Sequence, residues 1–251
     1  MAGTPKRIGI FFLFLVLHGV DTSAQARNGN IYALVVGVSE YTNPSNNLNY
    51  PDKDAAEIYD LLRANTSADK VKILTDRSAT HDNILKTANQ LFLNAGSNDI
   101  VILFFSGHGY QGGFIAHDKV LKYDELKILF RKTRAKRKVV FADACFSGDM
   151  RANSAPQNAH FTMFGNQVCL FLSSRSDQVS FESGGIGNGF FSYYLVLGLR
   201  GGADANRDRL ITARELFEFV NPRVRQYSYN RQVPVMWGKF DDAMVVLDWN
   251  K

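Results

Sequence analysis

Short, almost wholly apolar runs alternate along this chain with longer segments that have the amphipathic spacing of helices. Such runs fit strands that are buried on both faces, and their alternation with helices predicts a mostly parallel sheet covered on both sides, in one domain. The runs are 31–38, 70–74, 98–105, 138–142 and 168–172, with 244–247 as a candidate sixth strand. Helices are expected at 52–64, 80–95, 123–132, 188–199 and 212–224, with Asp52 and Thr80 as N-caps of the first two.

The first 26 residues have the pattern of a signal peptide rather than of a folded segment. A short basic stretch leads into an apolar run that His18 interrupts, and Ala24-Gln25-Ala26 then supplies a small-x-small cleavage pattern. The run is too short for a comfortable membrane span. We therefore expect an exported, periplasmic or secreted protein without a stable membrane span, whose domain covers 27–251. An uncleaved N-terminal anchor is the alternative.

Charge gives little support for a nucleic-acid partner. The formal net charge is +5, and six of the eight residues in 131–138 are basic. A basic patch that binds nucleic acid usually interleaves aromatic side chains, and this one has none. The solvated end of a helix and its exit loop is the favoured interpretation, so no nucleic acid is expected among the partners.

The two cysteines have different surroundings. Cys169 lies in the apolar run VCLFL, where a cysteine acts as a small hydrophobic residue. Two cysteines could form one bridge in an oxidising compartment, but one bridge is no disulfide framework. We therefore expect Cys169 in the core and Cys145 as a free thiol.

Chemically useful side chains follow two of the predicted strands. The run 98–105 leads to His108 between Gly107 and Gly109, and the run 138–142 leads to Cys145. Parallel strands end at the same edge of a sheet, about 4.8 Å apart when adjacent. An imidazole there can take the thiol proton, and the backbone N–H groups of Gly109 and Cys145 can donate to an oxyanion. The sequence thus predicts a nucleophile and its base; a metal site that also uses His117 and Asp118 lacks the usual ligand spacing.

The motifs FFSGHGY and DACFSG together resemble the caspase-like cysteine peptidases, in particular the metacaspase and bacterial caspase-domain branch. The segments ALVVGVSEY, SSRSDQVSFES and GNGFFSYYLVLGLRG add to the resemblance, which covers about residues 31–237. It implies a three-layer α/β/α sandwich with a six-stranded, mainly parallel sheet. It also implies hydrolysis of peptide bonds through a Cys145–His108 dyad and a thioester.

The same resemblance assigns Asp143, Asp54 and Ser106 to the pocket for the substrate residue on the amino side of the cut. Two carboxylates in a desolvated slot favour Arg or Lys and reject Asp. The expected substrates are therefore proteins or peptides with Arg or Lys at the cut site. A first-turn helix acid is the alternative for Asp54. A catalytically silent binding or scaffold module is the alternative for the whole chain.

The polar stretch 148–167 is longer than a simple connection needs, so it is a candidate active-site or processing loop. Arg151 follows the expected nucleophile closely and is the most obvious site of self-cleavage.

No cofactor is expected to be required. Ala152 stands where many metacaspases carry a calcium-binding acid, and only Asp118 offers an acid after the histidine motif. A separate pattern, 204–215, places oxygen ligands at EF-hand spacing but has Arg209 where a glycine makes the sharp turn. A capping box for the next helix also explains Thr212 and Glu215, and it is favoured because the loop lacks this glycine. The weak calcium candidates are Asp204, Asn206, Asp208 and Glu215.

Overall fold

The computed structural model describes residues 29–110, 112–144, 168–173, 182–183, 187–238 and 240–250. The signal-peptide prediction, Cys145 and Arg151 lie outside these residues.

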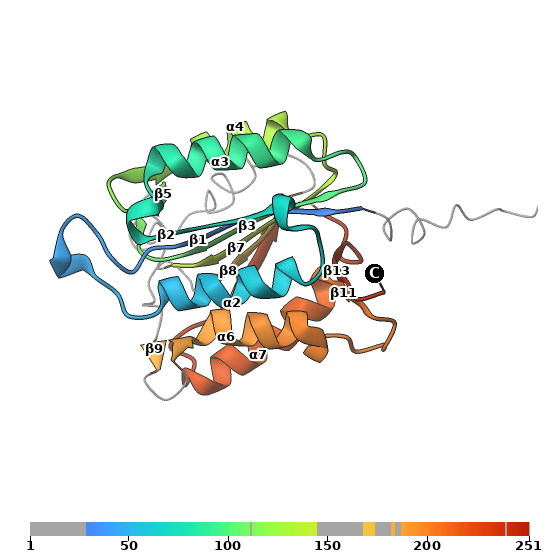
Figure 1. Ribbon diagram of the computed structural model, residues 1–251. Coiled ribbons are helices and arrows are strands. Elements are labelled where there is room, and N and C mark those ends of the chain that lie inside the picture. The colour runs from blue at the N-terminus through green and yellow to red at the C-terminus, as the bar shows by residue number, and fades with distance from the viewer. Residues whose placement is uncertain are drawn as a thin grey trace, which may run out of the picture.

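A six-stranded sheet in the order β12-β8-β7-β3-β1-β2 forms the centre of the molecule (Figure 1). Five strands are parallel, and only β12 runs antiparallel, against β8. These five are the apolar runs that the sequence marks as buried strands. The strands are β1 (Ile31–Gly37), β2 (Val71–Thr75), β3 (Ile100–Ser106), β7 (Arg137–Asp143), β8 (Val168–Leu172) and β12 (Val235–Gly238).

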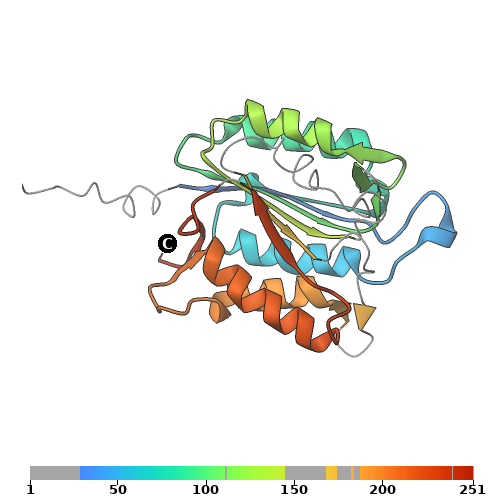
Figure 2. The same ribbon diagram turned by 180° about the vertical axis from the view of Figure 1, so that it is seen from behind.

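Helices cover both faces of this sheet (Figures 1 and 2). On one face lie α3 (His81–Asn94) and α4 (Tyr123–Lys132); on the other lie α2 (Pro51–Arg63), α6 (Phe190–Leu197) and α7 (Ala213–Tyr227). Side chains alternate along each strand between two apolar cores. In β1, Leu34 packs on the α3 side and Val35 on the α2 side. The predicted three-layer α/β/α sandwich is confirmed.

The smaller elements are short helical turns and short strands outside the central sheet. They are η1 (Pro44–Asn46), η2 (Ala68–Lys70), η3 (Asp76–Ser78), η4 (Gly198–Gly202), β4 (Gly109–Tyr110), β5 (Gly113–Ile115), β6 (Val120–Lys122), β9 (Glu182–Ser183), β10 (Asn188–Gly189), β11 (Leu210–Thr212) and β13 (Val245–Asp248).

The sixth strand is not the one that the sequence predicts. The run 244–247 contributes to β13, which pairs antiparallel with β11 in a separate two-stranded sheet. The sixth position belongs to β12, an edge strand whose residues are less buried than those of the inner strands. An apolar run indicates that a strand is buried but not which sheet it joins, and β13 is buried in a different sheet.

The helix caps follow the prediction in one case and depart from it in the other. The Thr80 hydroxyl accepts a hydrogen bond from the N–H of Asn83 at 3.3 Å, as expected of an N-cap. The N-cap of α2 is Tyr50, and Pro51 starts the helix, so Asp52 lies inside its first turn. Asp52 accepts a hydrogen bond from the Ser39 hydroxyl at 2.7 Å instead of capping.

The cysteine and basic-cluster interpretations can be compared with the structure directly. Cys169 is a buried free thiol in β8, and burial raises its pKa. Arg131 and Lys132 end α4, whereas Arg137 lies in β7 and donates to the carbonyl groups of Asn98 and Val245. The basic cluster is thus divided between a helix end and a strand.

Within the described ranges, none of the helices has both the length and the apolar character needed to cross a bilayer.

Candidate active site

His108 follows β3 at the edge where the parallel strands end. Gly107 precedes it with a φ of 152°, a backbone conformation that residues other than glycine rarely adopt. The N–H of His108 donates to the hydroxyl of buried Tyr41 at 2.8 Å, and the two ring centroids are 5.0 Å apart. Tyr41 therefore holds both the backbone and the ring of His108 in place.

The imidazole of His108 has a defined tautomer. Its Nε2 lies 2.8 Å from the carbonyl oxygen of Asn46 in η1. A carbonyl oxygen can only accept, so Nε2 must carry the hydrogen. In the neutral ring, the lone pair is then on Nδ1, which can act as a base toward a thiol.

Gly109 begins the hairpin that follows His108. The N–H of Ile115 donates to the carbonyl of His108 at 2.9 Å, and Gly109 is paired with Phe114 in the next position. Hydrogen-bonded and non-hydrogen-bonded pairs alternate along an antiparallel ladder. The N–H of Gly109 therefore points away from β5, as a donor to a bound oxyanion would have to.

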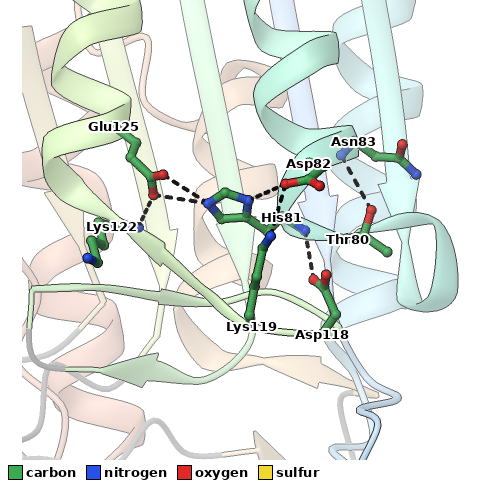
Figure 3. Close-up of polar contacts among 8 residues, drawn as sticks. All are labelled: Thr80, His81, Asp82, Asn83, Asp118, Lys119, Lys122 and Glu125. Carbon is green, nitrogen blue, oxygen red and sulfur yellow. Dashed lines mark hydrogen bonds and ion pairs between the residues drawn. The ribbon is translucent and has the colours of Figure 1, made fainter.

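A charged cluster anchors this hairpin to the helices above the sheet (Figure 3). The ring of His81, at the start of α3, has Nδ1 2.7 Å from Asp82 and Nε2 3.0 Å from Glu125 of α4. The carboxylate of Asp118 accepts the N–H of His81 at 2.8 Å, and Lys119 is 3.1 Å from Asp82. The turn 116–119 is thus tied to the start of α3, and His81 in turn links α3 to α4.

The register of the sheet aligns the strand that precedes His108 with the strand that precedes Cys145 in the sequence. Ser106 of β3 is paired with Asp143 of β7, and the N–H of Gly107 donates to the carbonyl of Asp143 at 3.1 Å. His108 comes two residues after Ser106, and Cys145 comes two residues after Asp143. The strands β3 and β7 therefore end at equivalent positions; Cys145 lies outside the described residues.

The structure brings the three predicted pocket residues together. The Ser106 hydroxyl donates to Oδ2 of Asp54 at 2.9 Å. A Cβ on Gly189 would lie 2.6 Å from Oδ2 of Asp143 and 3.3 Å from Oδ2 of Asp54, so both carboxyl groups face the same point. All three pocket side chains are buried; the exposed fractions of Asp54 and Asp143 are 2% and 5%.

The start of α6 supplies further partners that sequence reasoning missed. Oδ1 of Asp54 accepts from the side-chain amide of Asn188 at 3.1 Å and from the N–H of Gly189 at 3.2 Å. Oδ2 of Asp143 accepts from the hydroxyl of Ser192 at 2.8 Å and from its N–H at 3.2 Å. The signal for Ser192 in the sequence is a single serine within the apolar stretch FFSYYLVL. The positive end of α6 thus faces both carboxyl groups.

The two carboxyl groups differ from ordinary surface acids. Burial, and next the nearby charge of Asp143, raise the pKa of Asp54 to about 8. The hydrogen bonds from Ser106, Asn188 and Gly189 act in the opposite direction and only partly offset this. Near neutral pH, Asp54 therefore tends to hold a proton.

The weak calcium candidates are engaged in local hydrogen bonds. Asp204 accepts the N–H groups of Asp208 and Arg209, and Glu215 accepts the N–H of Thr212 at 3.0 Å while Thr212 caps α7. The predicted capping box is confirmed. No group of three His, Cys, Asp or Glu side chains in the described parts of the chain is arranged to hold a metal ion.

Two residues of the alternative metal site, His117 and Asp118, are engaged in other contacts. Nδ1 of His117 lies 2.7 Å from the carbonyl oxygen of Glu40, and the carboxylate of Asp118 holds the N-terminus of α3. Both residues therefore attach the hairpin after His108 to neighbouring segments of the chain.

Solved structures share this arrangement of sheet and helices. The protein GSU0716 of Geobacter sulfurreducens is 20% identical, with a TM-score of 0.66 over 86% of this chain and 96% of that one. Caspase-1 of Spodoptera frugiperda is 17% identical, with a TM-score of 0.65 over 85% of this chain and 88% of that one. At these identities the likeness shows the fold, which is caspase-like. A search of curated proteins found no match.

The family follows from the sequence match. The caspase domain model matches residues 31–244, which include the strand-end segments, the acidic residues and α6. The chain belongs to the caspase domain family, a family of cysteine peptidases. The resemblance noted from the two motifs is confirmed.

Proposed function

We propose that this chain is a cysteine endopeptidase that cuts peptide bonds after Arg or Lys. The observation that carries the proposal is the gathering of Asp54 and Asp143 beside Ser106, at the strand end that leads to His108. A cationic side chain between two carboxylates gains charge-assisted hydrogen bonds, and an Asp side chain meets like charge. This supports basic rather than acidic specificity.

In the proposed mechanism, Nδ1 of His108 takes the proton of the Cys145 thiol, and the thiolate attacks the carbonyl carbon of the substrate. The N–H groups of Gly109 and Cys145 donate to the oxyanion that forms. The imidazolium then protonates the leaving amine, which leaves a thioester on Cys145. His108 next removes a proton from water, which attacks the thioester and releases the acid product.

The burial of both carboxyl groups favours a second candidate, a caspase-fold binding or scaffold module without activity. A side chain that is only 2% or 5% exposed is not open to a substrate in the conformation described. In this alternative, Asp54 and Asp143 fasten α2 and β7 to the start of α6.

One labelling experiment separates the two candidates. An acylating, thiol-directed probe with an Arg side chain should label Cys145 in the wild-type protein and label nothing in Cys145→Ala. Profiling of the mature protein with a peptide library should then show cleavage after Arg and Lys. A protein that is not labelled and cuts no peptide is a scaffold, and preferred cleavage after Asp would contradict the pocket assignment.

Export and processing are proposed with the activity. We expect the mature chain to begin near Arg27, and N-terminal sequencing of protein from the producing cell tests this; an intact Met1 would contradict it. Self-cleavage at Arg151 would nick the wild-type protein and spare Cys145→Ala. Equal nicking of both would point to another protease.

A further inference from the structure

The buried carboxyl groups of Asp54 and Asp143 lie against the same glycine. Gly189 lies against both of them, because a Cβ there would come within 2.6 Å of Asp143 and 3.3 Å of Asp54. Carboxylates that share a desolvated site repel, and such a pair lowers its energy by keeping one proton.

Among the described residues, the groups that donate to Asp54 include no cation that would hold it ionised. Its three hydrogen-bond donors are neutral: the Ser106 hydroxyl, the Asn188 amide and the Gly189 N–H. Asp143 is the ionisable neighbour whose charge acts on it, and this charge opposes a second negative charge. The donors offer dipoles, which compensate for lost hydration less fully than a cation would.

The groups that surround Asp54 come from four elements. Within the described parts of the chain, β3 contributes Ser106, β7 contributes Asp143, and β10 contributes Asn188 and Gly189. α6 acts through Ser192, which donates to Asp143. The raised pKa of Asp54, about 8, agrees with this geometry.

We propose that Asp54 is protonated in the ligand-free protein and that a cationic side chain bound between Asp54 and Asp143 expels this proton. The proton goes to solvent, the carboxylate formed pairs with the cation, and no covalent bond to carbon changes. This inference rests on the proposed function, because it takes the pair as the binding site for Arg or Lys.

Proton release makes the capture of a basic side chain depend on pH. Below the pKa of free Asp54, each unit of falling pH should weaken binding by up to about tenfold, because the proton must first be removed. Above this pKa, binding should level off. A neutral side chain has no reason to displace the proton, so its binding should not follow this trend.

The test uses the full chain with Cys145→Ala, which binds substrate without turnover. Calorimetry with a peptide that has Arg at the cut position is run in buffers of different ionisation enthalpy, between pH 6 and 9. The same peptide with citrulline, a neutral isostere, in place of this Arg serves as the reference. It measures the proton change on binding that does not depend on the positive charge of the side chain. We expect close to one proton released per Arg peptide at pH 7, beyond the citrulline value.

A matched pair of variants assigns the proton to one residue. With Asp54→Asn added, the extra proton release should vanish, and the affinity should be weaker than that of the unsubstituted protein at pH 9 and should lose its pH dependence. Asp60→Asn, on the exposed side of the same helix, should behave like the unsubstituted protein. Circular dichroism checks that Asp54→Asn is folded; if it is not, the buffer comparison on the unsubstituted protein decides alone.

The outcomes separate this inference from the function beneath it. If Arg peptides are cleaved and bound with no proton release beyond that of citrulline, this inference is wrong and the proposed function stands. If Arg peptides are neither cleaved nor bound, both are wrong. If the release persists in folded Asp54→Asn, the proton belongs to another group and the inference fails.

Discussion

Nε2 of the His108 ring lies 2.8 Å from the main-chain carbonyl oxygen of Asn46. This contact leaves Nδ1 as the basic nitrogen, and it depends on η1, whose first turn Asn43 caps by accepting from Ser45. A backbone atom in a short loop thus determines which side of the ring can receive a proton.

The first prediction is that His108 and Cys145 act as one unit. Cys145→Ala and His108→Ala should each lower kcat/KM by about a thousandfold or more, and the double variant should be little worse. Steady-state kinetics on an Arg peptide measures this. Losses that multiply in the double variant would argue against a shared step, and normal turnover by Cys145→Ala would end the hypothesis.

The second prediction concerns specificity. Removing one partner of a desolvated charge pair typically costs ~2–5 kcal/mol. At ~1.4 kcal/mol per factor of ten, Asp143→Ala should lower kcat/KM for Arg peptides by roughly thirty- to several-thousand-fold. Asp54→Ala should act in the same direction, and Arg should be preferred over Lys because a planar fork fits two carboxylates.

The control for this prediction is the nucleophile itself. A small neutral alkylating reagent should modify Cys145 at a similar rate in the wild-type protein and in both variants. If both variants cut Arg peptides as well as the wild type does, then Asp54 and Asp143 are structural residues.

The third prediction concerns Gly189, whose backbone φ of −64° would itself accept an alanine. The added methyl group would be 2.6 Å from the Asp143 carboxyl group, so Gly189→Ala should destabilise the protein by about 1–3 kcal/mol through overpacking. It should also weaken cleavage after Arg. Urea denaturation and kinetics measure the two effects.

Gly96→Ala is the matched control, because its nearest contact would be an ordinary 3.4 Å to Asp99. It should leave cleavage after Arg unchanged. If Gly189→Ala has the same stability and activity as Gly96→Ala, the two carboxyl groups are not held against Gly189.

The fourth prediction concerns stability and pH. A buried acid with a pKa near 8 binds its proton more tightly in the folded state than in the unfolded state, where its pKa is about 4. The resulting stabilisation is fully present below pH 4 and is lost as pH rises through about 8. Asp54→Asn, which cannot ionise, should therefore lose less stability than the wild type between pH 5 and 9.

Urea midpoints across this pH range measure the difference. Asp60→Asn should follow the wild-type curve, because its side chain is exposed. Parallel curves for the wild type and Asp54→Asn would contradict the raised pKa of Asp54.

The fifth prediction decides between a helix cap and a calcium loop. The Thr212 hydroxyl accepts the N–H of Glu215 at 3.2 Å, so Thr212→Ala should cost about 1 kcal/mol of stability. Calcium or a chelator should leave the melting temperature unchanged. A calcium-dependent rise that Asp204→Ala abolishes would show that the loop binds the ion.

The sequence predicts the inner part of the sheet well and its edge poorly. Strands such as β3 and β7 are buried on both faces, and burial produces the apolar runs by which they were recognised. β12 is only half-buried, and its short apolar run directly follows Pro234, which makes the run a weak strand signal. The run at 244–247 is apolar for the same physical reason as β3, and sequence alone does not reveal which sheet an apolar strand joins.

The sequence likewise predicts some residues of the candidate site and misses others. His108, Asp54, Ser106 and Asp143 carry distinctive side chains, and their clustering fits the motif-based prediction. The contribution of Asn46 is a carbonyl group, which every residue has. Asn188 and Gly189 come from a glycine-rich stretch far along the chain, and Ser192 comes from the apolar helix that follows it. Only the packing of α6 against α2 and β7 brings them to the acids.

The late position of β12 in the chain has a consequence for biosynthesis. β8 is fully buried, but the strand that covers its outer edge begins only at Val235. At ~5–20 residues per second, a ribosome leaves this apolar edge exposed for roughly several seconds after β8 is made. Unpaired apolar edges promote aggregation. Nascent or truncated chains that end before Val235 should therefore depend on chaperones, and β12 protects the sheet as well as completing it.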